Sequence, residues 1–182
     1  GLCEARRRFA ILPCAYDEEE IEAARRLARK SPDRFVMTHA GRFYGPRSPD
    51  PLLRAIAQVA QDARLAERLE LRLISEFDPG VERLGNRLGI ASLIRQVGLT
   101  SHLHTLRHIL ESDLGVVVQP ATAVQIPSKT YEYLGCGVPI LALADEGATG
   151  RLVRQAKVGV VVEPGNVEQI AHVIRSFSSG VA

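Results

Sequence analysis

Short apolar runs alternate with amphipathic segments along most of the 182-residue chain. The runs with the length and composition of buried strands are Phe35–Thr38, Leu71–Ile74, Leu93–Val97, Leu114–Gln119, Val138–Ala144 and Val158–Val162. Uninterrupted apolar runs are typical of parallel strands that are covered on both faces. Between them, apolar residues recur at helical spacing. The predicted helices are Asp17–Lys30, Leu52–Ala66, Val81–Leu88, Leu103 to near Asp113, a short helix after Pro127, Thr149–Ala156 and Val167–Phe177.

This alternation of strands and helices predicts an α/β fold, in which an open, mostly parallel six-stranded sheet carries helices on both faces. The first predicted helix agrees with this organisation, because acids from Asp17 to Glu20 open it and bases from Arg25 to Lys30 close it. Such a charge order complements the helix dipole. With 182 residues, the chain has the size of one domain, or of one lobe of a larger protein.

Composition narrows the function classes only slightly. The chain is 46% hydrophobic and 24% charged, and its net charge of +2 gives no argument for nucleic acid or a membrane as a partner. No apolar run reaches the ~18 residues of a membrane-spanning helix, and no signal peptide is visible. Cys3, Cys14 and Cys136 lack metal-type spacing, and their odd number argues against a disulfide framework. We therefore expect a cytoplasmic protein with reduced thiols and no nucleic acid partner.

The run from Ile126 to Leu141 carries the densest chemical signal in the chain. It predicts a helix start, a short helix and a buried strand, with the polar side chains gathered at one end. Pro127 suits the start of a helix, where its missing N–H costs nothing. Ser128 and Lys129 add a hydroxyl and a cation to unsatisfied backbone N–H groups, and this combination favours phosphate. Glu132 follows on the same helix face, where its carboxylate can accept hydrogen bonds from ribose hydroxyls.

A purely structural alternative accounts for the same residues. Ser128 would only cap the helix, Lys129 would be solvated, and Glu132 would pair with a surface base. The surroundings favour the ligand site, because Leu114–Gln119 predicts the preceding strand and the loop 120–127 leaves its carboxyl end. Ligands of open α/β sheets bind at that edge. The sequence therefore predicts phosphate and ribose contacts on one helical turn.

A second group of candidate ligand residues follows the first predicted strand. Gly41 and Gly45 let the backbone approach a ligand closely, and Arg42 and Arg47 would clamp a diphosphate against the helix start. The alternative is two solvated arginines in a flexible loop. The chain contains no Gly-x-Gly-x-x-Gly and no Gly-Lys-Ser/Thr phosphate loop, which argues against a dehydrogenase and against a P-loop protein.

Three histidines, His102, His104 and His108, lie near one predicted helix start. The spacing of His104 and His108 would suit a metal ion, but no acidic or cysteine partner stands nearby at ligand spacing. We therefore expect helix capping and surface contacts from these residues, and we predict no metal site.

The order of these motifs resembles the C-terminal, donor-binding domain of GT-B glycosyltransferases, in particular the retaining bacterial enzymes of the glycosyl transferases group 1 type. Two segments carry most of the resemblance, IPSKTYEYLGCGVPIL at 126–141 and THAGRFYGPRSP at 38–49. Leu110–Leu114 and Val158–Val161 add weaker support, and residues 11–17 resemble the crossing between the two domains of such enzymes.

The resemblance implies a domain organisation and residue roles. Residues 1–16 would form the interdomain crossing and residues 17–182 a Rossmann-like nucleotide-sugar-binding lobe, with the N-terminal acceptor domain absent from this chain. Glu132 matches the glutamate that holds the ribose hydroxyls. The implied donor-binding residues are Gly41, Arg42, Arg47, Ser128, Lys129, Thr130 and Glu132. Arg42, Arg47 and Lys129 would also stabilise the departing diphosphate during catalysis.

One position departs from the family pattern. Many members carry a second glutamate eight positions before the ribose glutamate, near the donor sugar, and this chain has Val124 there with Gln125 beside it. The resemblance also places the nucleotide base along the stretch 97–103. We therefore expect the contacts to the donor sugar to differ from those of typical members.

The resemblance implies a glycosyltransferase that moves a sugar from a nucleotide-diphosphate sugar to a glycan or lipid-linked saccharide bound by the missing lobe. Such an enzyme would serve surface polysaccharide or glycoconjugate synthesis in the cytoplasm, with the full-length protein at the inner face of the membrane, and would need no metal or other cofactor. We expect this chain alone to bind nucleotide weakly and to transfer nothing. Two alternatives stay open: a non-catalytic nucleotide-binding or interaction module, and a lobe like that of a sugar-nucleotide epimerase.

Overall fold

The computed structural model describes residues 14–180 and contains one sheet of six strands. The strands are β1 (Phe35–Ala40), β2 (Leu69–Ile74), β3 (Ile94–Gln96), β4 (Leu114–Gln119), β5 (Ile140–Ala144) and β6 (Gly159–Val162). Their order across the sheet is β3-β2-β1-β4-β5-β6, and every neighbouring pair is parallel. The predicted open six-stranded sheet is confirmed, and it is parallel throughout.

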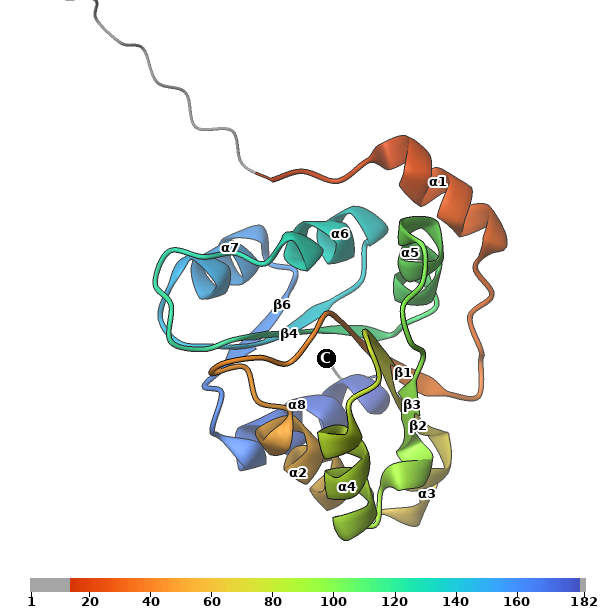
Figure 1. The fold of residues 1–182 in the computed structure, drawn as a ribbon, viewed down its shortest axis with the longest axis vertical. Helices are drawn as coiled ribbons and strands as arrows, with labels where there is room; N and C mark the ends of the chain where they lie inside the picture. The colour runs from red at the N-terminus through yellow and green to blue at the C-terminus, as the bar shows by residue number, and fades with distance from the viewer. Residues whose placement is uncertain (1–13, 181–182) are drawn as a thin grey trace, which may run out of the picture.

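Helices cover both faces of this sheet (Figure 1). One layer consists of α2 (Asp50–Val59), α3 (Ala63–Arg68), α4 (Pro79–Arg87) and α8 (Val167–Ser178). The opposite layer consists of α1 (Glu18–Leu27), α5 (His102–Leu110), α6 (Ser128–Cys136) and α7 (Ala148–Ala156). A single 3-10 turn, η1 (Ala91–Leu93), precedes β3. Two hydrophobic clusters, one for each layer, fill the space between the helices and the sheet.

The central strands β1 and β4 contribute side chains to both hydrophobic clusters, one on each face of the sheet. Met37 of β1 and Val116 of β4 belong to the cluster under α2 and α8, whereas Ala40 and Val117 belong to the cluster under α5 and α6. Every residue of β1, β2 and β4 is buried. Because both faces of these strands are covered, apolar residues are favoured at odd and even positions alike, as in the apolar part of β4. β2 differs, because Glu70 and Arg72 are buried in it as a pair at 3.0 Å.

The predicted helix Leu52–Ala66 is two helices, so the single-helix expectation is wrong. α2 ends at Val59, and α3 begins at Ala63. Between them, the backbone of Asp62 is extended, and its side chain accepts a hydrogen bond from the Arg64 amide at 2.9 Å. This local bond caps a free backbone N–H at the start of α3, and it favours a new helix over the continuation of α2.

Other element boundaries shift by a turn or less. β1 continues to Ala40, beyond the predicted end at Thr38, and β2 begins at Leu69. β5 begins at Ile140 rather than at Val138. The Val138 amide donates to the Tyr133 carbonyl at 3.0 Å and so completes the end of α6, and the proline that follows has no N–H for the sheet ladder.

The strand order creates a break at the centre of the sheet. β1 and β4 are neighbours, although the chain runs from β1 out to β3 before it returns to β4. Within the described residues, the ladder between them pairs only Met37 with Leu114 and Thr38 with Gly115. The two strands then separate toward their carboxyl ends. In doubly wound sheets, this switch point is where ligands bind.

Among residues 14–180, no helix is both long enough and apolar enough to cross a membrane. The predicted crossing segment 1–16 lies almost wholly outside the described residues. At its end, the ring of Tyr16 packs against Gly135 of α6, where a Cβ would approach the ring within 2.5 Å.

Candidate functional site

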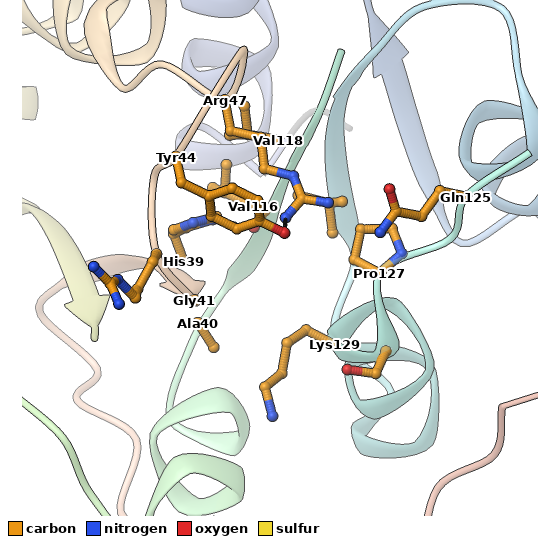
Figure 2. A pocket seen from close by; sticks show the side chains of 13 residues that line it. His39, Ala40, Gly41, Tyr44, Arg47, Val116, Val118, Gln125, Pro127 and Lys129 are labelled. Atoms are coloured by element: carbon orange, nitrogen blue, oxygen red, sulfur yellow. Dashed lines mark hydrogen bonds between the residues drawn. The ribbon is translucent and has the colours of Figure 1, made fainter. Parts of the chain in front are cut away.

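A cavity of about 290 Å³ opens where β1 and β4 separate. Its lining comes from β1 and the loop after it, from the middle of β4, and from the start of α6 with the loop before it (Figure 2). The two groups of candidate residues, which lie far apart in the sequence, therefore face each other across one cavity.

Two side chains, His39 in the cavity lining and Tyr133 buried behind it, replace the missing β1–β4 ladder. His39 Nδ1 donates to the carbonyl oxygen of Val116 at 3.0 Å. From α6, the Tyr133 hydroxyl donates to the Thr38 carbonyl and accepts from the Ala40 amide, both at 3.0 Å. Backbone groups that the separation of the strands would leave unpaired are thereby satisfied, which buried peptide groups require.

His39 is a neutral imidazole in this setting. Burial lowers its pKa to about 4, and its bond to a carbonyl oxygen assigns the ring proton to Nδ1. The ring stacks on Phe43 with 4.4 Å between the ring centroids. Nε2 is buried and has no hydrogen-bond partner in the described part of the chain. The cavity therefore has one unused acceptor nitrogen in its wall.

The loop between β1 and α2 forms one wall of the cavity. Gly41 (φ 140°) and Gly45 (φ 56°) have backbone conformations that favour glycine, and they shape this loop. Arg42 lines the wall, and its Nη1 lies 3.3 Å from the Glu76 carboxylate at an exposed position. An exposed ion pair of this kind is weak, so the guanidinium can exchange its partner for a ligand phosphate.

Arg47 reaches further over the cavity. Its guanidinium packs over the Tyr44 ring at 4.4 Å from the centroid, and it donates to the Tyr44 hydroxyl and to the Gln119 side chain. Gln119 in turn donates to Gln125 Oε1 at 3.4 Å. These contacts extend from the arginine loop to the loop before α6, and they direct the Arg47 cation toward the cavity (Figure 2).

The start of α6 forms the opposite wall. Pro127 is the N-cap residue, and within the described residues no side chain caps this helix. Ser128 is exposed in the first turn. The structural alternative in which Ser128 caps the helix is therefore wrong. The amides of the first turn and the Lys129 ammonium stand beside the cavity, an arrangement that suits an anion.

Glu132 lies one turn further along α6, beside the cavity rather than in its lining. Its side chain is almost buried. Oε1 accepts a hydrogen bond from Lys129 Nζ at 2.8 Å and lies 3.2 Å from His102 Nε2. Oε2 is buried as well and has no hydrogen-bond partner among residues 14–180. Leaving a buried carboxylate oxygen unpaired costs free energy, so a hydroxyl donated by a ligand would be stabilising here.

The structure brings most of the predicted residues together. Those that line the cavity are Gly41, Arg42, Arg47, Ser128 and Lys129. Glu132 borders the cavity through its bond to Lys129. Thr130 does not line the cavity: its side chain is completely buried, on the side of α6 that Tyr133 presents to the sheet. Its contact with the donor stays a prediction.

Some residues of the site were not expected from the sequence. His39 stands inside an apolar strand, and its only sequence signal was a titratable residue shortly before Gly41. The partnership of His102 with Glu132 joins two helices and has no local pattern at all. Gln125 lines the cavity, whereas the neighbouring Val124 is 86% exposed and does not line it.

The three histidines near the start of α5 do not gather. His102 contacts Glu132, His104 is exposed, and His108 is buried with Nδ1 at 3.1 Å from Arg72. In the described segment 14–180, no group of three or more histidine, cysteine, aspartate or glutamate side chains is arranged to hold a metal ion.

Solved structures share this fold. A glycosyltransferase involved in lipopolysaccharide biosynthesis, WaaG, matches with a TM-score of 0.73 and 19% identity, over 92% of this chain and 46% of WaaG. Sucrose-phosphate synthase from Thermosynechococcus elongatus matches with a TM-score of 0.74 and 20% identity, over 92% of this chain and 42% of that one. At such identities the likeness concerns the fold alone. The chain has the fold of one Rossmann-like lobe of these GT-B proteins.

Curated relatives extend the likeness to the sequence. D-inositol 3-phosphate glycosyltransferase from Rhodococcus erythropolis is 28% identical over 169 residues, which make up 89% of this chain and 37% of the relative. This chain thus spans little more than a third of that protein. The model for glycosyl transferases group 1 matches residues 20–180, and the chain accordingly belongs to this family.

Proposed function

We propose that this chain binds the nucleotide-diphosphate sugar of a glycosyltransferase, as the C-terminal, donor-binding lobe of an enzyme of the retaining type. The observation that most supports the proposal is the uncapped start of α6, which faces Arg47 across the cavity and has Glu132 one turn further along. The helix start and the nearby cations suit a diphosphate. Glu132 Oε2, which has no hydrogen-bond partner within residues 14–180, suits a ribose hydroxyl.

The chemical contribution of this lobe would be electrostatic. When the bond between the sugar carbon and the diphosphate oxygen breaks, its electron pair stays on the diphosphate, and the α6 dipole with Arg42, Arg47 and Lys129 would stabilise that charge. The acceptor oxygen forms the new bond to the sugar carbon and loses its proton to a base outside these residues. The proposal involves no metal ion and no other cofactor.

The remaining parts of the activity belong to the whole protein. The curated relative is much longer than this chain, which covers 37% of it. We propose that a second lobe binds the acceptor, a glycan or a lipid-linked saccharide, and that residues 1–16 lead from that lobe into this one. A role in surface polysaccharide or glycoconjugate synthesis, at the cytoplasmic face of the membrane, remains part of this proposal.

Titration with nucleotides tests the proposed donor site. We expect the chain to bind at least one of UDP, GDP, dTDP and ADP in isothermal titration calorimetry. Glu132→Ala should weaken that binding roughly 10-fold or more, because a hydrogen bond to a charged group contributes about 1.5–3 kcal/mol.

Glu163→Ala is the matched control, because Glu163 is exposed and lies outside the cavity lining. It should leave the affinity unchanged. If none of the four nucleotides binds, or if Glu132→Ala binds them as tightly as the unchanged chain does, the donor-site proposal fails.

A non-catalytic nucleotide-binding module is the second candidate. The observation that favours it is Val124, which is 86% exposed where many family members have a glutamate near the donor sugar. Such a module would bind the nucleoside diphosphate and the corresponding nucleotide sugar equally well. A donor site would bind the nucleoside diphosphate and the nucleotide sugar with different affinities. A comparison of these two affinities therefore separates the donor lobe from the non-catalytic module.

A further inference from the structure

His102 lies where three helices of one layer meet. It is the first residue of α5, and its ring stands between a carboxylate of α1 and a carboxylate of α6. Nδ1 lies 2.8 Å from Glu20 Oε2, and Nε2 lies 3.2 Å from Glu132 Oε1. The imidazole therefore joins α1 to α6 across the layer.

The two contacts require a particular protonation state. A carboxylate oxygen accepts hydrogen bonds, so both ring nitrogens must carry protons, as in the imidazolium ion. Partial burial lowers the pKa of His102, but the hydrogen bonds and charges of Glu20 and Glu132 outweigh that effect and raise the pKa above its ordinary value. The two carboxylates thus favour the cationic form of the ring.

The same carboxylate oxygen of Glu132 has a second cationic partner. Lys129 Nζ lies 2.8 Å from Oε1, and this lysine also lines the cavity. With Lys129 and His102 both on Oε1, rotation of the carboxylate is restricted. Oε2 is left buried and, in the described residues, without a hydrogen-bond partner.

We infer that His102 is a positioning residue for Glu132. As an imidazolium held by Glu20, it fixes the Glu132 carboxylate so that Oε2 can accept a hydrogen bond from a ribose hydroxyl of the bound nucleotide. The inference rests on the proposed function, because it assigns Glu132 to the nucleotide. It makes the site selective for ribonucleotides, since a 2′-deoxyribose offers one hydroxyl fewer to the presented oxygen.

A pH dependence follows from the two contacts. A neutral imidazole has a single N–H, so it can serve only one of the two carboxylates. The charged groups that face the ring are Glu20 from α1 and Glu132 from α6, and Lys129 shares the Glu132 oxygen. Nucleotide affinity is therefore highest below the folded-state pKa of His102 and falls as the pH rises through it, while Lys129 retains part of the restraint.

The experiment compares ribose with deoxyribose. UDP, GDP and ADP are each titrated against the 2′-deoxy counterpart, with the unchanged chain and with His102→Gln. The unchanged chain is expected to prefer the ribonucleotide roughly 10-fold. In His102→Gln, most of this preference should disappear, while the affinity for the 2′-deoxy nucleotide changes little. His104→Gln is the matched control, because His104 is exposed on the same helix and bonds to Ser101 rather than to Glu132.

A pH series adds a readout that a merely structural role would not change. For the unchanged chain, the affinity for the ribonucleotide should fall as the pH rises through the pKa of His102, which lies above its ordinary 6.5, whereas His102→Gln should lose this dependence. Glu20→Gln removes one of the two carboxylates and leaves the imidazole in place. It should move the loss of affinity to lower pH, and it tests the inference even if His102→Gln does not fold.

The outcomes separate this inference from the proposed function. If no nucleotide binds the unchanged chain, both fail. If Glu132→Ala weakens binding, but His102→Gln keeps the ribose preference and the pH profile of the unchanged chain, only the positioning role of His102 is overturned. The same holds if Glu20→Gln leaves the pH profile in place.

Discussion

At the scale of single residues, His39 and Tyr133 complete the sheet where its backbone pairing ends. Tyr133 bonds to the carbonyl of Thr38 and the amide of Ala40, and its ring lies against Gly115, where a Cβ would come within 2.7 Å. The sequence predicted a helix and two strands here, but not these contacts. They join residues far apart in the chain, and local periodicity carries no information about such pairs.

The buried His39 predicts a loss of stability in mild acid. In the unfolded chain it titrates near its ordinary pKa of 6.5, whereas burial lowers the folded-state pKa to about 4. Between these two pKa values, His39 is therefore protonated in the unfolded chain and neutral in the folded chain. Its contribution to the free energy of unfolding is complete above about pH 6.5 and is lost as the pH falls toward about 4. The loss amounts to about 3 kcal/mol at most.

Urea denaturation at pH 7 and pH 5 measures this effect. His39→Gln keeps an N–H for the Val116 carbonyl but does not titrate, so its stability should fall less between the two pH values than that of the unchanged chain. His172→Gln is the control, because His172 is exposed on α8. Equal losses in all three proteins would contradict the assignment.

At the scale of elements, local sequence accounts for α6 better than for α2 and α3. Pro127 marks the start of α6, and Gly137 ends it in a left-handed conformation with φ 71°. Both signals were visible in the sequence. The break at Asp62 was not foreseen, because the apolar spacing continues through it and a single capping side chain decides the outcome.

The start of β6 provides a prediction about an element. Gly159 pairs with Ile140 of β5, and a Cβ at Gly159 would overlap the Ile140 backbone. Gly159→Ala should therefore lower the free energy of unfolding by about 2 kcal/mol or more, because backbone must move to accommodate the methyl group.

Gly165→Ala is the matched control in urea denaturation, since a Cβ there would meet nothing within 4 Å. It should change the stability by less than about 0.5 kcal/mol. If the two variants are equally stable, the close approach of β6 to β5 does not explain the glycine at position 159.

At the scale of the whole molecule, the strand order decides where chemistry can take place. The half-sheets β3-β2-β1 and β4-β5-β6 meet at the single short ladder between β1 and β4, and the cavity lies beyond its end. Arg47 belongs to the first half, and Lys129 to the second. A ligand in the cavity would therefore hold the two halves together.

This arrangement predicts a thermal shift. At 100 times its dissociation constant, a nucleoside diphosphate that binds only the folded chain adds about 2.7 kcal/mol, or roughly 5 °C or more in Tm for a chain of this size. Differential scanning fluorimetry with UDP, GDP, dTDP and ADP should show this rise, and the corresponding nucleosides, which lack phosphates, should give a smaller one. Equal shifts with and without the diphosphate would contradict a diphosphate site at the α6 start.

The sequence by itself determined the α/β class, the six strands, most helices to within a turn, and the two polar segments at 41–47 and 128–132, because periodicity, caps and glycines act over a few residues. Only the tertiary structure decided that these segments share one cavity, that Thr130 is buried, and that Glu132 is held by Lys129 and His102. These outcomes depend on strand order and on packing between distant elements. Such contacts contribute to stability only after the sheet has brought these distant elements together.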